Sequence, residues 1–161
     1  MSDLLRGLPP IVDAQARILI LGSFPSAASL AARQYYGHRQ NQFWRLLAEL
    51  LEQPLTGMDY AAKQAALHHA GIAVWDVYAS CEREGSLDSA IRSVRANDFR
   101  KLRKLAPSLS RICFNGQTAA RFARELGQLG YATRVLPSTS PAYTLAFEDK
   151  LAAWRAALAS A

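Results

Sequence analysis

The chain has 161 residues, half of them hydrophobic, and its 19 Lys and Arg against 13 Asp and Glu leave a formal charge of +6. This apolar content excludes an intrinsically disordered chain, and no apolar run approaches the ~20 residues of a membrane-spanning helix. Two cysteines are too few for a disulfide scaffold or a four-thiolate iron–sulfur cluster, and their spacing is not that of a zinc site.

The length and the N-terminal residues bound the organisation of the protein. A chain of this size fits one domain, which we expect to span residues 1–161. The first residues lack the apolar core of a secretory signal, so we expect a soluble, cytoplasmic protein with no membrane partner. The positive charge permits a polyanionic partner but does not establish one.

Four short apolar segments predict the strands of a sheet. They are residues 17–21, 72–78, 111–114 and 133–136. The first and the third are almost continuously hydrophobic, which is typical of strands covered on both faces. Segments with helical character lie at residues 43–51, 60–69, 98–105, 117–126 and 147–158. Because strands and helices alternate, the sequence predicts one α/β/α domain with a parallel sheet between two layers of helices.

The segments that follow the predicted strands are rich in Gly, Pro, Ser, Thr, Asn and Asp. They are residues 22–26, 76–80, 115–118 and 137–141. Such residues are common in any loop, so composition alone carries little weight. In an open parallel sheet, however, ligands bind beyond the carboxyl ends of the strands. These four loops therefore predict a site along one edge of the sheet.

Residues 34–44 are the densest cluster of aromatic, imidazole and amide side chains in the chain. Asn41 precedes a predicted apolar helix and has two interpretations, as the N-cap of that helix or as a polar group facing a ligand. A cap needs only the side-chain oxygen and does not explain the neighbouring aromatic and amide residues. We expect Phe43 and Trp44 to anchor the helix in the core.

The sequence resembles the uracil-DNA glycosylase superfamily, and most closely its DNA-deoxyinosine (hypoxanthine-DNA) glycosylase branch. The matching segments are Gly22-Ser-Phe-Pro-Ser, Tyr35-Tyr-Gly-His-Arg-Gln-Asn-Gln-Phe-Trp, Trp75-Asp-Val-Tyr-Ala-Ser-Cys-Glu-Arg-Glu-Gly-Ser-Leu-Asp, Phe114-Asn-Gly and Ser138-Thr-Ser-Pro-Ala. The second and third segments are specific, and the shorter ones are weak alone. The resemblance implies an α/β/α domain with four parallel strands, no metal or cofactor, and hydrolysis of the N-glycosidic bond of a damaged base.

Two departures from the superfamily pattern indicate the substrate. Phe24 stands where many members carry a water-positioning Asp or Asn; the deoxyinosine branch also lacks that residue, and Asn41 matches the implied catalytic residue of that branch. Ser138 stands where uracil-specific enzymes carry a His that stabilises the departing uracil anion. The resemblance therefore implies excision of hypoxanthine first, with uracil and xanthine as secondary substrates.

The resemblance and the loop positions together predict a substrate site formed by Gly22, Ser23, Phe24, Pro25, Tyr35, Tyr36, His38, Asp76 and Asn115. The three aromatic residues would stack on the base or belong to the core. Asp76 would accept the N1–H of hypoxanthine or bind loop amides. Asn115 would bind base or phosphate or form a turn, and His38 would hold phosphate, assist the leaving group or pack.

Two further features are expected to meet DNA. The loop formed by Ser138, Thr139, Ser140, Pro141 and Ala142 would press into the minor groove, unless it is an ordinary strand–helix turn. A basic series is expected to form a solvated helix face that adds long-range attraction; it consists of Arg92, Arg95, Arg100, Lys101, Arg103, Lys104 and Arg111.

The leading hypothesis is a monofunctional DNA glycosylase of base-excision repair, acting as a monomer on double-stranded DNA with a damaged base. It would need no cofactor or metal and would work in the cytoplasm, associated with the nucleoid. The alternative is a catalytically inactive nucleic-acid-binding module that retains the fold. A small-molecule hydrolase is disfavoured because a compact substrate leaves the 138–141 loop without a role. The chain also lacks a Gly-x-Ser-x-Gly elbow and a phosphate-loop signature.

Overall fold

The centre of the protein is a four-stranded parallel sheet. The computed structural model describes residues 3–159, and its main sheet has the order β3–β2–β6–β7. The strands are β2 (Ile18–Gly22), β3 (Ile72–Asp76), β6 (Arg111–Asn115) and β7 (Ala132–Leu136). All three pairings are parallel. The predicted parallel sheet is therefore confirmed, and all four carboxyl ends meet at one edge.

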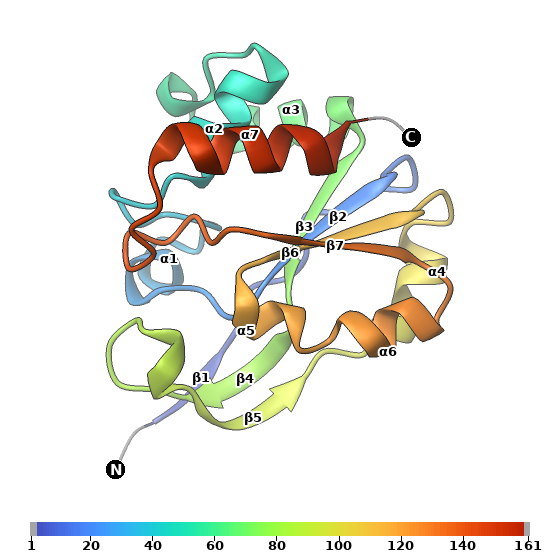
Figure 1. Cartoon of the computed structure of the whole chain (residues 1–161). Helices are drawn as coiled ribbons and strands as arrows, with labels where there is room; N and C mark the ends of the chain where they lie inside the picture. Colours follow the sequence, from blue (N-terminus) through green and yellow to red (C-terminus); the bar gives the residue numbers. More distant parts are fainter. Residues whose placement is uncertain (1–2, 160–161) are drawn as a thin grey trace.

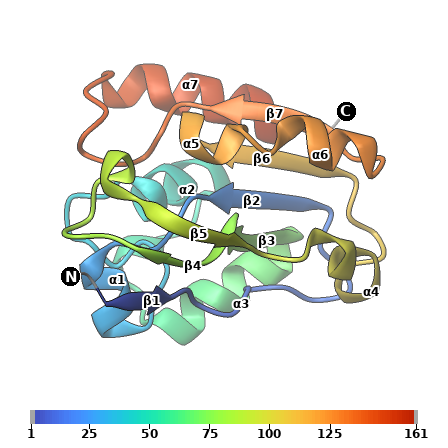
Figure 2. The ribbon, with the colours of Figure 1, turned by 90° about the horizontal axis from the view of Figure 1, so that it is seen from below.

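Helices cover both faces of this sheet (Figures 1 and 2). One face carries α2 (Phe43–Leu51), α3 (Tyr60–Ala70) and α7 (Phe147–Leu158). The other carries α4 (Leu102–Leu105), α5 (Gln117–Ala120) and α6 (Ala123–Gln128), and a short helix α1 (Ala27–Ala32) follows β2. Single 3₁₀ turns lie at Leu55–Gly57, Asp88–Ala90 and Phe99–Lys101. The predicted α/β/α layering is confirmed.

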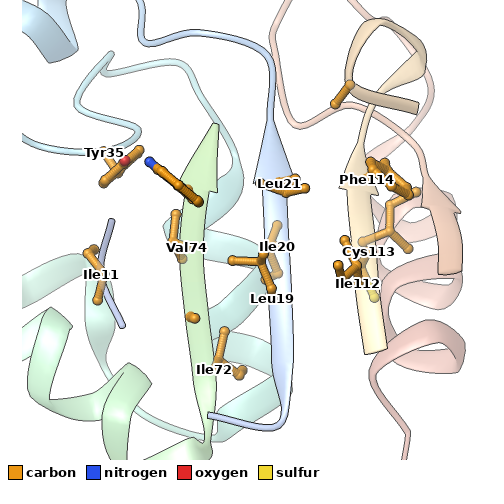
Figure 3. Packing of buried hydrophobic residues seen from close by; sticks show 14 of the residues in the cluster. Ile11, Leu19, Ile20, Leu21, Tyr35, Ile72, Val74, Ile112, Cys113 and Phe114 are labelled. Carbon is orange, nitrogen blue, oxygen red and sulfur yellow. The ribbon is translucent and has the colours of Figure 1, made fainter. Parts of the chain in front are cut away.

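Apolar side chains on the central strands hold the layers together. Leu19 and Leu21 on β2 lie between β3 and β6, and each is at most 1% exposed (Figure 3). Between α2 and α7, the rings of Phe43 and Trp154 pack 6.0 Å apart and are fully buried. Each buried side chain of this size contributes about 1.5–3 kcal/mol to folding. The predicted anchoring role of Phe43 is confirmed, and the core fixes the strand ends on which the site is built.

A second, antiparallel sheet is the main difference from the sequence prediction. The predicted strand 72–78 ends at Asp76, and after Val77 the chain enters β4 (Tyr78–Glu82). This strand pairs with β1 (Leu4–Arg6) and with β5 (Arg92–Ala96). The short β1 and the wholly exposed β5 lack the apolar alternation on which strand prediction depends.

The basic series does not form one helix face. Arg92 and Arg95 lie on the edge strand β5, and Arg111 lies on β6, so the prediction is wrong for these three residues. The remaining members, Arg100 to Lys104, do lie in the 3₁₀ turn and α4. The predicted helix 117–126 is also divided, because α5 ends at Ala120 and α6 begins at Ala123.

No helix among residues 3–159 combines the length and the hydropathy needed to cross a membrane.

Candidate active site

A cavity of about 450 Å³ lies beyond the carboxyl ends of the parallel strands. Residues after β2, β3, β6 and β7 line it, together with residues 35–41 before α2 and residues 86–88 after β4. Every residue that we predicted to bind or act on a substrate lines this one cavity: Gly22, Ser23, Phe24, Pro25, Tyr35, Tyr36, His38, Asn41, Asp76, Asn115, Ser138, Thr139, Ser140, Pro141 and Ala142.

Asp76 is a buried carboxylate at the last position of β3. It is 5% exposed, and within the described part of the chain its Oδ2 atom has no hydrogen-bond partner. Burial raises the pKa of Asp76 to about 7; the charge of Asp88 raises it too, while Arg83 lowers it. A buried polar atom without a partner is costly. Asp76 is therefore poised to accept or donate a hydrogen bond to whatever enters the cavity.

Gly22 makes room for this carboxylate. Parallel pairing places Gly22 opposite Asp76, and a Cβ atom at Gly22 would lie 2.6 Å from Asp76 Oδ1 and 2.9 Å from the Tyr36 hydroxyl. Separations this short are far inside van der Waals contact. The strand therefore ends in glycine because any larger side chain would displace two groups that line the cavity.

A loop that sequence reasoning missed closes one side of the cavity. Ser86, Leu87 and Asp88 line it, and Ser23 Oγ donates to Asp88 Oδ1 over 2.6 Å. The amide of Ala27 donates to Ser86 Oγ over 3.0 Å. The resemblance included this segment, but its approach to the site depends on β4 of the second sheet, which was not predicted.

Arg83 ties the same loop to the segment after β2. Its guanidinium donates to the carbonyl oxygens of Pro25 (2.7 Å) and Gly85 (2.8 Å) and lies 5.3 Å from the centre of the Phe24 ring. Phe24 is 7% exposed. One part of this ring therefore packs on the arginine, and the ring also contributes to the cavity wall.

Asn41 is not the N-cap of α2, because Gln42 holds that position, so this interpretation of the sequence is wrong. Its Oδ1 nevertheless accepts a hydrogen bond of 2.9 Å from the backbone amide of Phe43, the first residue of α2. A carboxamide oxygen has two lone pairs, and the amide nitrogen carries two further protons. Asn41 is half-buried and lines the cavity. The bond from Phe43 therefore leaves one acceptor position and both donors of Asn41 available.

The two tyrosines before Asn41 differ in their surroundings. Tyr35 is 2% exposed, its hydroxyl donates to the carbonyl of Leu8, and its own carbonyl accepts from Trp44 Nε1, so we assign it mainly to packing. Tyr36 has a left-handed backbone, with φ of 56°, and its ring lies 3.9 Å from that of Phe43. Burial raises the pKa of Tyr36 well above its usual value, so its hydroxyl stays protonated.

Asn115 joins two strand ends. Its Nδ2 atom donates to the Tyr36 hydroxyl (3.1 Å) and to Thr139 Oγ1 (3.0 Å), and its Oδ1 accepts from the Thr139 amide (3.0 Å). These bonds reach 24 and 79 residues along the chain, so the side chain of Asn115 holds other segments of the cavity wall rather than a local turn. Thr139 is 1% exposed and anchors the loop, whereas Pro141 and Ala142 are exposed.

His38 lines the cavity, and one of its ring nitrogens is bound to backbone. Its Nδ1 accepts a hydrogen bond of 3.1 Å from the amide of Gln40, so in the neutral ring the proton lies on Nε2. Among residues 3–159, no group of three His, Cys, Asp or Glu side chains is placed to hold a metal ion.

Replacing Gly22 by Ala tests the packing at the strand end. We expect Gly22→Ala to lower the free energy of unfolding by about 1–3 kcal/mol, because the new methyl group overpacks Asp76 and Tyr36. The matched control is Gly127→Ala on the exposed side of α6, where nothing lies within 4 Å of the added atom. That control should be neutral or stabilising by up to about 1 kcal/mol. Urea denaturation measures both, and equal effects would contradict the steric account.

The raised pKa of Asp76 predicts the pH dependence of stability. Because the folded pKa is about 7 and the unfolded value is about 4, ionisation costs stability as pH rises between them. Relative to Asp76→Asn, the wild type should lose on the order of 4 kcal/mol of unfolding free energy between those limits. Asp98→Asn is the control of opposite sign, because hydrogen bonds from Arg100 lower the pKa of Asp98. If the unfolding free energies of wild type and Asp76→Asn changed with pH in the same way, the raised pKa of Asp76 would be refuted.

Known proteins match this chain over most of its length. The family model of the uracil DNA glycosylase superfamily matches residues 9–160. A protein of Methanosarcina acetivorans named hypoxanthine DNA glycosylase is 42% identical over 151 residues, covering 94% of this chain and 96% of that relative. One of the same name from Methanosarcina barkeri is 36% identical, covering 92% and 94%.

A solved structure is similar over almost the whole length. It is a solution NMR structure from Methanosarcina acetivorans, described provisionally as a uracil DNA glycosylase. It superposes with a TM-score of 0.89 at 40% identity and covers 97% of each chain. Family model, relatives and structure all extend over both the core and the loops that form the cavity. The chain belongs to the uracil DNA glycosylase superfamily.

Proposed function

We propose that this protein is a monofunctional DNA glycosylase that flips a deaminated base out of double-stranded DNA and excises it by hydrolysis, with hypoxanthine as the main substrate. The observation that carries the proposal is the unpartnered carboxylate of Asp76 in a cavity that Asn41 also lines. The names of the two relatives support hypoxanthine. The cavity of about 450 Å³ is of the size that binds small ligands, and a purine base fits within that range.

Base recognition is assigned to Asp76. Hypoxanthine carries a proton on N1, whereas adenine has a lone pair there. The ionised Asp76 carboxylate accepts that N1–H in a charge-assisted hydrogen bond, and it repels the adenine lone pair. Oδ2 is buried and without a partner, so a rotation of the carboxyl group that brings this atom to the N1–H would also remove the cost of an unsatisfied buried oxygen.

Hydrolysis is assigned to a water held by Asn41. The free lone pair of Asn41 Oδ1 accepts a hydrogen bond from the water, whose oxygen then forms a bond to C1′ of the deoxyribose as the N-glycosidic bond breaks, while the proton that the water loses passes to solvent. The bonding electrons and a proton leave with the base, so hypoxanthine departs neutral. An amide does not take up a proton near neutral pH, so Asn41 acts by position and dipole.

Opening of the duplex is assigned to the loop of residues 138–142. Thr139 anchors it, and its exposed tip at Pro141 and Ala142 borders the cavity. Flipping costs a few kcal/mol, least for a mispaired base such as hypoxanthine opposite thymine. Ser138 offers no imidazole to stabilise a uracil anion, so uracil and xanthine remain secondary substrates in this proposal.

Strand cleavage is not part of the proposed reaction. A Schiff base would need a lysine in the cavity, and none is among the lining residues. Lys150 has a pKa lowered by burial, but it does not line the cavity. We propose further that residues 1–161 act as one monomeric domain in the cytoplasm at the nucleoid; the family match over residues 9–160 supports the single domain.

One assay tests the function. Labelled duplexes carrying hypoxanthine, uracil or xanthine opposite each base are incubated with excess protein and then treated with alkali, which breaks abasic sites. We expect cleavage at hypoxanthine to be fastest and to require alkali. No break at any lesion would instead favour an inactive DNA-binding module, and breaks without alkali would overturn the monofunctional assignment.

Asn41→Ala separates catalysis from stability. We expect the single-turnover excision rate to fall at least about tenfold, which is ~1.4 kcal/mol in the barrier. Loss of the hydrogen bond from the Phe43 amide should cost about 0.5–1.5 kcal/mol of stability. Asp59→Ala, which removes the cap of α3, is the control with a similar stability loss away from the cavity. Equal rates for the two variants would remove Asn41 from the mechanism.

Asp76→Asn tests base recognition through pH. In the wild type, hypoxanthine excision should rise as pH increases through about 7, because the ionised acceptor replaces the carboxylic acid. The Asn variant should be slower above that pH and should lack this rise, since its amide does not titrate. Single-turnover rates across the neutral range measure both, and a rise that persists in the variant would assign the titration to another group.

A further inference from the structure

Lys150 is a buried cation with no anionic partner. It lies in the first turn of α7, is 1% exposed, and within residues 3–159 the only ion pairs are His68–Asp13 and Arg100–Asp98. A buried ammonium is costly, and the positive end of a helix dipole makes this position less favourable still. The neighbouring Glu148 and Asp149 form no ion pair with it. The groups that bind the ammonium of Lys150 must therefore explain why it is buried.

The ammonium group binds three oxygen atoms from two separate segments. It donates to Gln42 Oε1 (2.9 Å), to the carbonyl of Tyr143 (2.8 Å) and, over 3.4 Å, to the carbonyl of Ser140. Gln42 follows Asn41 directly, and the backbone N–H of Gln42 donates to the carbonyl of Thr139 over 3.0 Å. Lys150 therefore joins the start of α2 to the loop that borders the cavity after β7.

We infer that Lys150 is a positioning residue that holds the 138–143 loop at a fixed distance from Asn41, so that the gap opened in DNA is aligned with the residue that places the water. This inference rests on the proposed function. A lysine serves this purpose because its three ammonium protons satisfy three oxygens at once without a carboxylate. A carboxylate partner at this place would add negative charge where the DNA backbone approaches.

Lys150→Met removes the ammonium and keeps the aliphatic stem. We expect single-turnover excision of hypoxanthine from duplex DNA to fall at least about tenfold, because the free loop no longer supports flipping. Excision from single-stranded DNA, where no partner base must be displaced, should fall less than about threefold. Lys63→Met is the matched control: Lys63 also has a pKa lowered by burial, but it lies over the Trp44 ring, away from the loop. It should leave both rates unchanged.

Gln42→Met is a second variant in case Lys150→Met folds poorly. It removes one acceptor of the ammonium but leaves Asn41 and the backbone bond to Thr139 in place. It should show the same duplex-selective loss to a smaller extent. Equal losses on duplex and single-stranded substrates in both variants, or no loss in either, would overturn the positioning role.

Binding of a product-like duplex separates this inference from the function itself. A duplex with a tetrahydrofuran abasic analogue requires the loop but no hydrolysis. Fluorescence anisotropy should show Lys150→Met binding this duplex at least about fivefold more weakly, with affinity for the undamaged duplex unchanged, since that affinity depends on phosphate contacts. If the wild-type protein bound the tetrahydrofuran duplex more tightly than Lys150→Met but excised no base, the proposed glycosylase activity would be refuted and the role of Lys150 in holding the loop would stand. Unchanged affinity for the analogue would refute the role of Lys150.

Discussion

The parallel pairing of β2 with β3 is the constraint on which the site depends. It sets Gly22 opposite Asp76, and the missing side chain leaves room for a buried carboxylate and for the Tyr36 hydroxyl. A shift of the register by one residue would place Leu21 beside the carboxylate, with its side chain on the opposite face. Strand registry in the apolar core therefore decides which polar groups meet at the edge of the sheet.

The rest of the site is built by joining loops to one another. Asn115 binds Tyr36 on one side and Thr139 on the other, and Arg83 joins the loop after β4 to the segment after β2. These are bonds between protein groups that hold the cavity open before a ligand arrives. A site prepared in this way loses little conformational entropy on binding and so uses its contacts for selectivity.

The sequence predicted the main sheet and the cavity wall because both leave local signals. Buried strands such as β2 read as apolar runs, and polar loops follow them, so the convergence of Asp76 and Asn115 could be foreseen, whereas Asn41 was placed at the site by the family resemblance. The antiparallel sheet could not, because β5 is wholly exposed and has no pattern. Asp88 in the cavity wall and Lys150 behind the 138–143 loop were likewise missed, since their contacts cross 65 and 108 residues of chain. Distant polar contacts of this kind leave no periodicity in the sequence.

The two duties of Asn41 affect how relatives of this protein should be interpreted. A side chain that accepts a bond from the first amide of α2 is under selection for stability whether or not the enzyme works, so a descendant that had lost its chemistry would still keep asparagine there. Asp76 is the opposite case, because its unpartnered Oδ2 atom destabilises the folded protein, and only substrate binding favours keeping the residue. After a loss of function, we expect mutations to replace Asp76 before they replace Asn41. Among homologous sequences, Asp76 opposite Gly22 is therefore a better indicator of retained catalytic activity than Asn41.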